Sequence, residues 1–315
     1  MTTNLSELVT RGTRPGHEMA VHASAGAATW DELRAQVAAI ELPVEPGQPV
    51  CVCLPNGVEL VATLFAVWRA GAVYVPLNPR AAEAERAKII DRIDPAAIVT
   101  VDGIEARPSS ATFDPDTALI QFTSGTTGDP KAVQLTHSGV AKLLDGVIAT
   151  LKTSDADKTP MPNLVPVSLS LWAGIYQVLF AYTIGAGVIV MDGFAPAEFA
   201  RLVQQFGIRS TVLPPAAMTS LADDPDVSDL TPLKYVRSIT APLSPLQARR
   251  FVDKFGTAVL NCWGQTEIGG EIVGWSAADW KEFHTTKLGA VGRPHRGVQI
   301  RAEENGELVV MTPAL

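Results

Sequence analysis

Residues 161–191 contain no charged side chain, and this stretch limits the possible folds more than any other part of the sequence. A helix of ~20 apolar residues is enough to span a membrane, so the length alone would permit one. Prolines and glycines interrupt the stretch, however, at Pro162, Pro166, Gly174, Gly185 and Gly187. They divide it into a predicted strand at 163–167, a buried helix at 171–182 and a strand at 187–191. Apolar strands of this kind are typical of parallel sheets covered on both faces, so we expect no membrane span.

The same alternation of apolar strands and helices continues through most of the chain. Strands are predicted at 50–54, 73–76, 97–101, 118–122, 210–213, 235–240 and 258–261, and helices at 56–68, 82–93, 138–151, 196–206 and 245–255. The last of these helices has the clearest boundaries, because Ser244 and Pro245 favour its start and Gly256 its end. Alternating strands and helices predict an α/β fold, with mostly parallel sheets and helices on both faces in a two-lobed core.

The pattern changes after about residue 271, where only short strands are predicted. Asn305-Gly306 lies between two such strands, 299–302 and 307–310, and this dipeptide strongly favours a hairpin turn. We therefore expect residues 1–315 to form one core domain. Residues 1–270 would form its α/β lobes, and residues 271–315 a small antiparallel β unit.

Charge and cysteine content exclude several classes of protein. The formal net charge is −8 with only 25 Lys and Arg residues, which disfavours a nucleic-acid-binding surface. The three cysteines, Cys51, Cys53 and Cys262, are too few and too unevenly spaced for a disulfide framework or a zinc site, and we interpret them as small buried apolar residues. The first 20 residues lack an apolar run of signal-peptide length, so a cytoplasmic location is expected.

The sequence TSGTTGDPK, from Thr123 to Lys131, directly follows a predicted strand and has the composition of an anion-binding loop. Its glycines allow backbone N–H groups to approach an anion, its hydroxyls can donate to phosphate oxygens, and its lysine adds a positive charge. The candidate phosphate ligands are Thr123, Ser124, Gly125, Thr126, Thr127, Gly128 and Lys131. The segment lacks the Walker A pattern. The alternative interpretation is a polar hairpin turn.

The same nine residues resemble the phosphate-binding signature of the adenylate-forming enzyme superfamily, which includes acyl-CoA synthetases, luciferases and peptide-synthetase adenylation domains. Further segments are similar to family motifs in the same order: AGAVYVPLN at 70–78, APLS at 241–244, WGQTE at 263–267, GAVGRP at 289–294 and GELVV at 306–310. The resemblance covers nearly the whole chain. It identifies the sequence as the N-terminal core of such an enzyme.

The resemblance implies a reaction in which a carboxylic acid attacks the α-phosphorus of ATP, giving an acyl adenylate and pyrophosphate. Neutralising the charge of the two anions is the main catalytic task. The family pattern implies that Lys131 and the rest of its loop hold the leaving phosphates. It also implies that Thr266 contacts the α-phosphate and that Glu267 binds Mg²⁺, for which a carboxylate is a suitable ligand. The acceptor of the acyl group would be CoA or a carrier-protein thiol.

The resemblance also implies the position of the nucleotide base. Thr240, Ala241 and Pro242 would line the adenine, with Gly264 nearby, and Trp263 replaces the tyrosine that stacks on the base in the family. Stacking needs only a flat aromatic face, so this replacement is mild. A larger departure precedes the turn, because Ile239 and Thr240 replace a pair of glycines. These side chains would narrow the nucleotide or acyl pocket.

The expected acyl pocket departs from the family as well. When Gly174 is aligned with the family glycine, Leu171 occupies the position of a histidine that is frequent there. The apolar residues Leu169, Leu171, Trp172 and Ile175 suit a small apolar acid, or they are ordinary core. His137 is expected to lie near a helix cap rather than to act in catalysis.

The sequence ends at Leu315, shortly after GELVV. In the family, a ribose-binding aspartate, a hinge and a mobile C-terminal domain with a catalytic lysine follow this point. We expect that lid domain to be absent here, which would impair adenylation by the isolated chain unless a separate C-terminal domain supplies it. The alternative is a non-catalytic module that binds a nucleotide or an acyl group.

Overall fold

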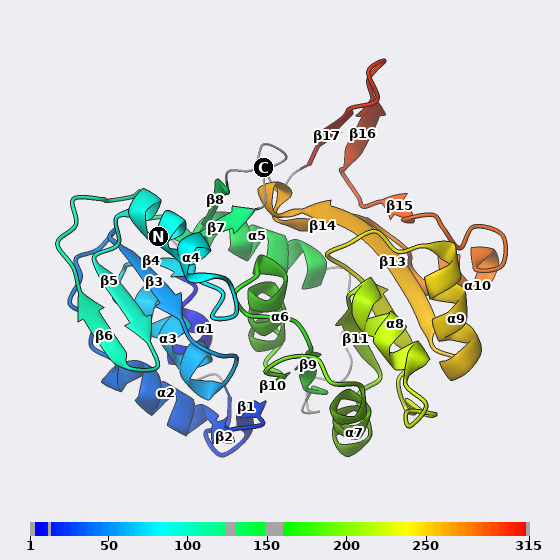
Figure 1. Cartoon of the computed structure of the whole chain (residues 1–315), viewed down its shortest axis with the longest axis horizontal. Helices are drawn as coiled ribbons and strands as arrows, with labels where there is room; N and C mark the ends of the chain where they lie inside the picture. The colour runs from blue at the N-terminus through cyan, green and yellow to red at the C-terminus, as the bar shows by residue number, and fades with distance from the viewer. Residues whose placement is uncertain (1–3, 12–13, 124–129, 149–159, 313–315) are drawn as a thin grey trace. The chain divides into compact units, whose positions relative to one another are not determined.

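The computed structural model describes residues 4–11, 14–123, 130–148 and 160–312 (Figure 1). The chain forms two compact units. The first unit contains residues 1–160 and 168–192, and the second contains residues 161–167 and 193–315. The uncharged stretch 161–191 is therefore divided between the two.

The first unit is built on a six-stranded sheet. Its strands, in spatial order, are β6 (Gly103–Ala106), β5 (Ala97–Thr100), β3 (Pro49–Cys53), β4 (Val73–Pro76), β7 (Thr117–Thr123) and β8 (Lys131–Thr136). The four central strands are parallel, and the two edge strands pair antiparallel with their neighbours. The carboxyl ends of the four parallel strands therefore all lie at the same edge of the sheet. Thr123, the last residue of β7, is at this edge.

A second sheet of the first unit contains β2 (Gly26–Thr29), β1 (Met19–Ala23) and β10 (Val188–Val190), with β1 antiparallel to β2 and parallel to β10. The helices of this unit are α1 (Glu7–Thr10), α2 (Trp30–Ala39), α3 (Val58–Arg69), α4 (Glu83–Ile93), α5 (His137–Ile148) and α6 (Trp172–Thr183). Helix α3 is buried along most of its length, which explains why its sequence is apolar on nearly every side.

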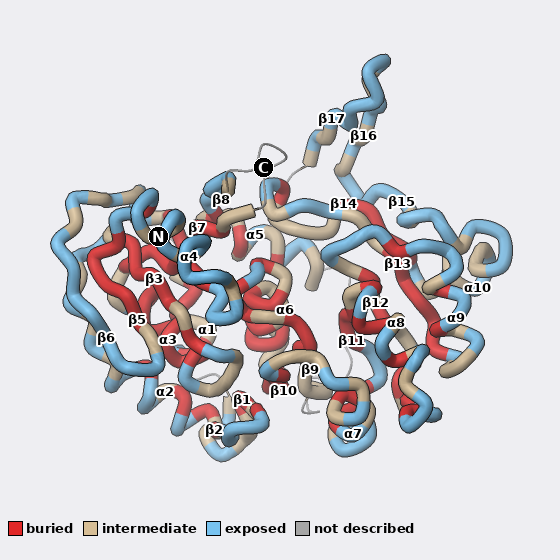
Figure 2. Tube along the Cα trace, viewed as in Figure 1, coloured by how far each residue is buried: buried red, intermediate tan, exposed pale blue. Residues whose placement is uncertain are grey.

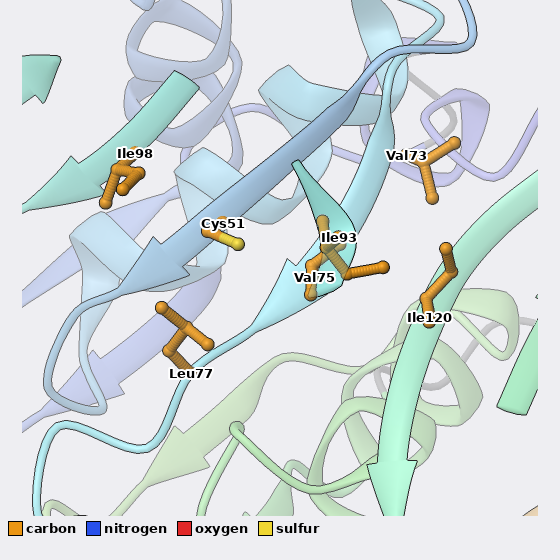
Figure 3. Close-up of a cluster of buried hydrophobic side chains, with 7 residues drawn as sticks. All are labelled: Cys51, Val73, Val75, Leu77, Ile93, Ile98 and Ile120. Atoms are coloured by element: carbon orange, nitrogen blue, oxygen red, sulfur yellow. The ribbon is translucent and has the colours of Figure 1, made fainter. Parts of the chain in front are cut away.

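Apolar side chains from several strands, together with Ile93 of helix α4 and Leu77 just after β4, form a cluster in the core of the first unit (Figure 3). Its buried members are Cys51, Val73, Val75, Leu77, Ile93, Ile98 and Ile120. Burial raises the pKa of the Cys51 thiol to about 12, so Cys51 is a small apolar core residue, as predicted. Cys53 and Cys262 are only half-buried, so the prediction of full burial holds for Cys51 alone.

The second unit contains a five-stranded sheet in the order β11 (Ser210–Leu213), β12 (Tyr235–Ser238), β13 (Ala258–Gln265), β14 (Gly270–Gly274) and β15 (Arg293–Pro294). The first three strands are parallel, and β14 and β15 are antiparallel to their neighbours. The remaining elements are β9 (Asn163–Val165), α7 (Pro196–Phe206), α8 (Pro215–Asp223), α9 (Pro245–Phe255), the 3₁₀ turn η1 (Thr266–Ile268), α10 (Ala277–Phe283), and the hairpin of β16 (Gln299–Ala302) and β17 (Leu308–Met311). Figure 2 shows that this hairpin is largely exposed.

The predicted fold class is confirmed, because each unit contains a set of parallel strands with helices, flanked by antiparallel strands, and the last two described strands form a small antiparallel hairpin. Helix α9 begins with a capping box at Ser244 and ends at Gly256, whose φ of 65° is left-handed. None of the described helices is long and apolar enough to cross a membrane.

The structure differs from the sequence-based expectations in several local details. Strand β8 was not anticipated, and the strand predicted at 258–261 continues to Gln265 because it pairs with β14. The helix predicted at 56–68 begins two residues later, at Val58, with Gly57 as its N-cap.

Candidate functional site

The predicted phosphate loop connects two antiparallel strands at the edge of the six-stranded sheet. Thr123, at the end of β7, pairs directly with Lys131, at the start of β8. Thr123 is half-buried and Lys131 is exposed. The other candidate phosphate ligands, Ser124, Gly125, Thr126, Thr127 and Gly128, lie outside the described residues. The connection therefore has the topology of a hairpin, with its two described ends side by side.

A second positive charge lies beside this loop, and sequence analysis did not identify it. Arg92, in the last turn of α4, donates from Nη1 to the carbonyl of Pro130 at 2.6 Å. Its guanidinium carbon lies 6.0 Å from the centre of the Phe122 ring. Arg92 thus contacts residues next to both ends of the loop and adds a positive charge near Lys131. No local pattern points to it, because it precedes Pro130 by 38 residues.

His137, at the start of α5, is a structural residue. It is only 4% exposed, and its Nδ1 accepts a hydrogen bond from the backbone N–H of Leu5 at 3.2 Å. Burial lowers the pKa of His137 to about 4, against the opposing effect of Asp116. Asp116 accepts hydrogen bonds from the backbone N–H of Ser138 at 3.1 Å and from its hydroxyl at 2.5 Å. His137 is therefore a buried neutral residue at a helix start, the position that the sequence predicted.

The residues of the predicted apolar wall differ in their exposure. Leu169, Trp172 and Ile175 are buried and belong to the core of the first unit. Leu171, which directly precedes α6, is 45% exposed. Gly174 is required by packing, since a Cβ there would overlap the carbonyl of Ser168. Of the four wall residues, Leu171 alone presents a large apolar surface that a ligand could contact.

Two polar side chains hold the segment around Leu171 in place. Asn56 accepts a hydrogen bond from the backbone N–H of Leu169 at 2.9 Å and donates to the carbonyl of Met191 at 2.8 Å. Gln121, buried on β7, donates from Nε2 to the carbonyl of Ser170 at 3.2 Å. The segment is thereby tied to the strand that ends at Thr123.

In the second unit, two candidate nucleotide-binding segments lie at the carboxyl ends of neighbouring parallel strands. Residues Ile239–Pro242 follow β12, and Trp263–Glu267 comprise the end of β13 and the start of η1. Ligands of open α/β sheets bind outside the carboxyl ends of the strands. The sheet thus brings together the two segments that sequence analysis singled out in this half of the chain.

Thr240 has a backbone conformation that glycine normally adopts. Its φ is 70°, and its side chain is exposed, as are those of Ala241 and Pro242. A left-handed conformation is unfavourable for a β-branched residue. The turn therefore keeps the backbone shape expected for a glycine although a threonine occupies the position. Ile239 is half-buried beside it.

Trp263 lies on the apolar face of β13. Its side chain packs against the buried residues Ile268, Ile272 and Val273. It also borders a cavity of about 450 Å³, whose other lining residues are Gln265, Ile268, Glu307, Leu308, Val309 and Val310. The structure places Trp263 beside β17. Gly264 is required by the strand pairing, because a Cβ there would overlap the carbonyl of Gly270 on β14.

Glu267, the predicted magnesium ligand, has a carboxylate that is free of partners among the described residues. It lies in η1, its carboxylate is exposed, and it makes no ion pair or hydrogen bond with the described residues. Mg²⁺ commonly takes one or two carboxylates together with substrate phosphates and water. In the described part of the chain, no group of three or more His, Cys, Asp or Glu side chains forms a metal site. Glu267 is next to the half-buried Thr266, and its role as a magnesium ligand stays a prediction.

Comparisons with known proteins agree with these motifs. The model of the family described as "AMP-binding enzyme" matches residues 10–115 and 103–313. Among curated proteins, the probable non-canonical nonribosomal peptide synthetase CymA of Salinispora arenicola is 29% identical over 258 residues, which is 80% of this chain and 3% of that protein. 4-Coumarate–CoA ligase 5 of Oryza sativa subsp. japonica is 28% identical over 300 residues, 81% of this chain and 54% of that protein. The chain thus spans about half of the rice ligase and a small fraction of the synthetase.

A solved structure shows the same fold. The inhibitor-bound N-terminal domain of FACL13 from Mycobacterium tuberculosis matches with a TM-score of 0.80 at 19% identity, covering 98% of this chain and 86% of that one. The family match extends from residue 10 to residue 313. The chain therefore belongs to the AMP-binding enzyme family.

Proposed function

We propose that the chain binds ATP and activates a carboxylic acid as an acyl adenylate, releasing pyrophosphate. The acyl group then passes to the thiol of CoA or of a carrier protein. The observation that most supports this proposal is the occurrence of TSGTTGDPK after β7 and WGQTE at the end of β13, in a chain of the AMP-binding enzyme family. The curated relatives support it as well, since one is a CoA ligase and another a nonribosomal peptide synthetase.

In the proposed mechanism, the chain supplies positive charge and hydrogen-bond donors to the phosphates. The loop from Thr123 to Lys131 holds the β- and γ-phosphates, and Arg92 adds to the positive potential at its end. Thr266 donates to the α-phosphate. Preorganised donors of this kind stabilise charge as it develops in the transition state. Glu267 would hold Mg²⁺, which neutralises phosphate charge when it is bound.

The turn of Thr240, Ala241 and Pro242, with Trp263 and Gly264, would bind the adenine. The exposed apolar side chain of Leu171 supports an acid with an apolar body, because the acid would contact it without hydrogen bonding.

The alternative function is a module that binds a nucleotide or an acyl group without turnover. Leu171 also favours this alternative, because the family has a polar residue at its position.

Calorimetry tests the proposal without requiring turnover. ATP with Mg²⁺ and AMP should each bind at or below millimolar concentration, and Lys131→Met should weaken ATP more than AMP because it removes a positive charge from the leaving phosphates. Lys142→Met, at an exposed position on α5, is the matched control and should leave both affinities unchanged. Failure of both nucleotides to bind would overturn the proposal. Binding without pyrophosphate release over a panel of aliphatic and aromatic acids would favour the alternative.

A further inference from the structure

Strand β6 forms one edge of the six-stranded sheet of the first unit (Figure 1). In the described part of the chain it pairs only with β5, in antiparallel register. All residues of β6 are exposed, as Figure 2 shows. An exposed edge strand is a template on which another strand can pair. Strand β8, which follows the phosphate loop, lies at the other edge of the same sheet, so β6 has no part in the proposed reaction.

The pairing with β5 determines which backbone groups of β6 face outward. The N–H of Arg107, directly after β6, donates to the carbonyl of Ala96 at 2.8 Å, so Arg107 directs its backbone groups toward β5. Hydrogen-bonded and non-hydrogen-bonded pairs alternate along an antiparallel ladder. Glu105 therefore also faces β5, whereas Ile104 and Ala106 direct their N–H and C=O groups to the outside. These outward groups are spaced as a further antiparallel strand requires.

The side chains of this edge carry opposite charges two positions apart. Nη1 of Arg107 lies 3.2 Å from Oε1 of Glu105, and the two side chains are 40% and 66% exposed. They share one face of the sheet, and Ile104 and Ala106 lie on the other face, because side chains alternate along a strand. Edge strands that avoid self-association commonly carry lysines, whose like charges repel a second copy. An edge with one acidic and one basic residue instead attracts its own copy when the two strands run antiparallel.

Charge selects one register for two paired copies. The outward groups of both copies meet if the twofold axis passes through Ile104, Glu105 or Ala106. An axis at Glu105 sets this residue against itself, and like charges directly opposite each other destabilise a strand pair. An axis at Ile104 leaves both charges without an opposite charge across the ladder. An axis at Ala106 sets Glu105 opposite the partner's Arg107, and Arg107 opposite the partner's Glu105, so both cross-strand pairs are attractive.

We propose that two copies of this chain associate through β6, with the twofold axis at Ala106, so that their six-stranded sheets become continuous. The two Ala106 residues exchange backbone hydrogen bonds. The N–H of Ile104 donates to the carbonyl of the partner's Pro108, and a proline there leaves no N–H unpaired. On the same face, the partner's Pro108 covers the end of a groove of about 270 Å³ that α2, α3 and Ile104 line. The interface is short, so we expect a weak dimer, with a dissociation constant on the order of 10–100 μM.

Analytical ultracentrifugation over a range of about 1 to 500 μM protein tests the association. The mass should rise from 33.4 kDa toward twice that value as the concentration increases. Glu105→Arg and Arg107→Glu should each weaken the dimer by about 10- to 30-fold, because each change makes two attractive cross-strand pairs repulsive. The double variant with both changes exchanges the two charges and should recover most of the affinity. This recovery separates pairing between copies from damage to the fold.

A proline at the axis provides a second test. Ala106→Pro removes the outward N–H, and proline is tolerated on the solvent side of an edge strand, so the monomer should keep its melting temperature while the dimer is lost. Arg301→Glu is the matched control, because it reverses a charge in another exposed ion pair at a strand, with Glu303, and should leave the dissociation constant unchanged.

Hydrogen exchange locates the interface. The amides of Ile104 and Ala106 should exchange more slowly in the dimer than in the monomer, since only pairing with a second copy protects them. A chain that stays monomeric at every concentration would overturn the inference. A dimer that survives Ala106→Pro, or whose affinity does not return in the double charge variant, would place the association at another surface and overturn it as well.

Discussion

Thr240 departs from the family pattern at a position where the backbone has a left-handed conformation that favours glycine. Its φ of 70° is unfavourable for a β-branched residue. Thr240→Gly should therefore raise the free energy of unfolding by about 1 kcal/mol, measured by urea denaturation. Ala241→Gly is the matched control, because Ala241 is also exposed but has no left-handed φ, and it should destabilise the chain slightly. If both variants lost the same unfolding free energy, the result would contradict backbone strain at Thr240.

Glu267 is the proposed magnesium ligand, and its free carboxylate allows a direct test. Glu267→Gln should weaken the binding of Mg·ATP by about 10-fold and leave that of AMP nearly unchanged, since AMP does not need the ion. Glu282→Gln changes another exposed carboxylate of the second unit and should affect neither ligand. Calorimetry with each nucleotide gives the two affinities. An equal loss for ATP and AMP would assign Glu267 to the adenine or to the fold instead.

His137 makes the stability of the chain depend on pH. Its pKa is about 4 in the folded state and near 6.5 in the unfolded state, so below pH 6.5 the unfolded state binds more protons. The contribution is fully present above pH 6.5 and is lost as the pH falls to 4, by up to about 3 kcal/mol. His137→Asn should flatten this part of the curve of unfolding free energy against pH. The exposed His17, changed to Asn, should leave the curve as it is.

At the scale of elements, the pairing of β13 with β14 determines the shape of the WGQTE segment. Gly264 faces the carbonyl of Gly270 so closely that no Cβ fits. Gly264→Ala should lower the free energy of unfolding by about 2 kcal/mol and weaken nucleotide binding, as strain forces the strands apart. Gly146→Ala in α5 has open space around it and should stabilise the chain slightly. Thermal melting of both variants checks the prediction, and a neutral Gly264→Ala would contradict it.

The elements that could be predicted are those whose boundaries depend on local chemistry. Caps within a few residues set the ends of two helices. Helix α9 starts at Ser244-Pro245 and ends at Gly256, and helix α7 starts at Pro196 and ends at Gly207. The extension of β13 to Gln265 could not be predicted, because it depends on pairing with β14. Sequence analysis missed strand β8 because the anion-binding pattern of the loop before it is much clearer than the strand pattern of residues 131–136. Arg92 meets Pro130 and Phe122 only through the tertiary fold.

At the scale of the whole chain, the described parts of both units contain candidate residues for one reaction. The first unit provides Thr123, Lys131 and Arg92 at the phosphate loop, and the second provides the turn at Thr240 and the segment that ends at Glu267. The family match extends over both units. Adenylation of an acid requires attack at the α-phosphorus, whereas a kinase or an ATPase cleaves at the γ-phosphorus. The position of cleavage therefore separates the proposed activity from other uses of ATP.

The most direct test is a single-turnover experiment with α-³²P-labelled ATP, Mg²⁺ and excess protein over a panel of aliphatic and aromatic acids. An excess of protein allows a slow reaction to be detected. The proposed function predicts acyl-[³²P]AMP and pyrophosphate, formed only when a suitable acid is present, and a much smaller yield with Glu267→Gln. Labelled ADP with release of orthophosphate, or unchanged ATP in the absence of any nucleotide binding, would contradict it.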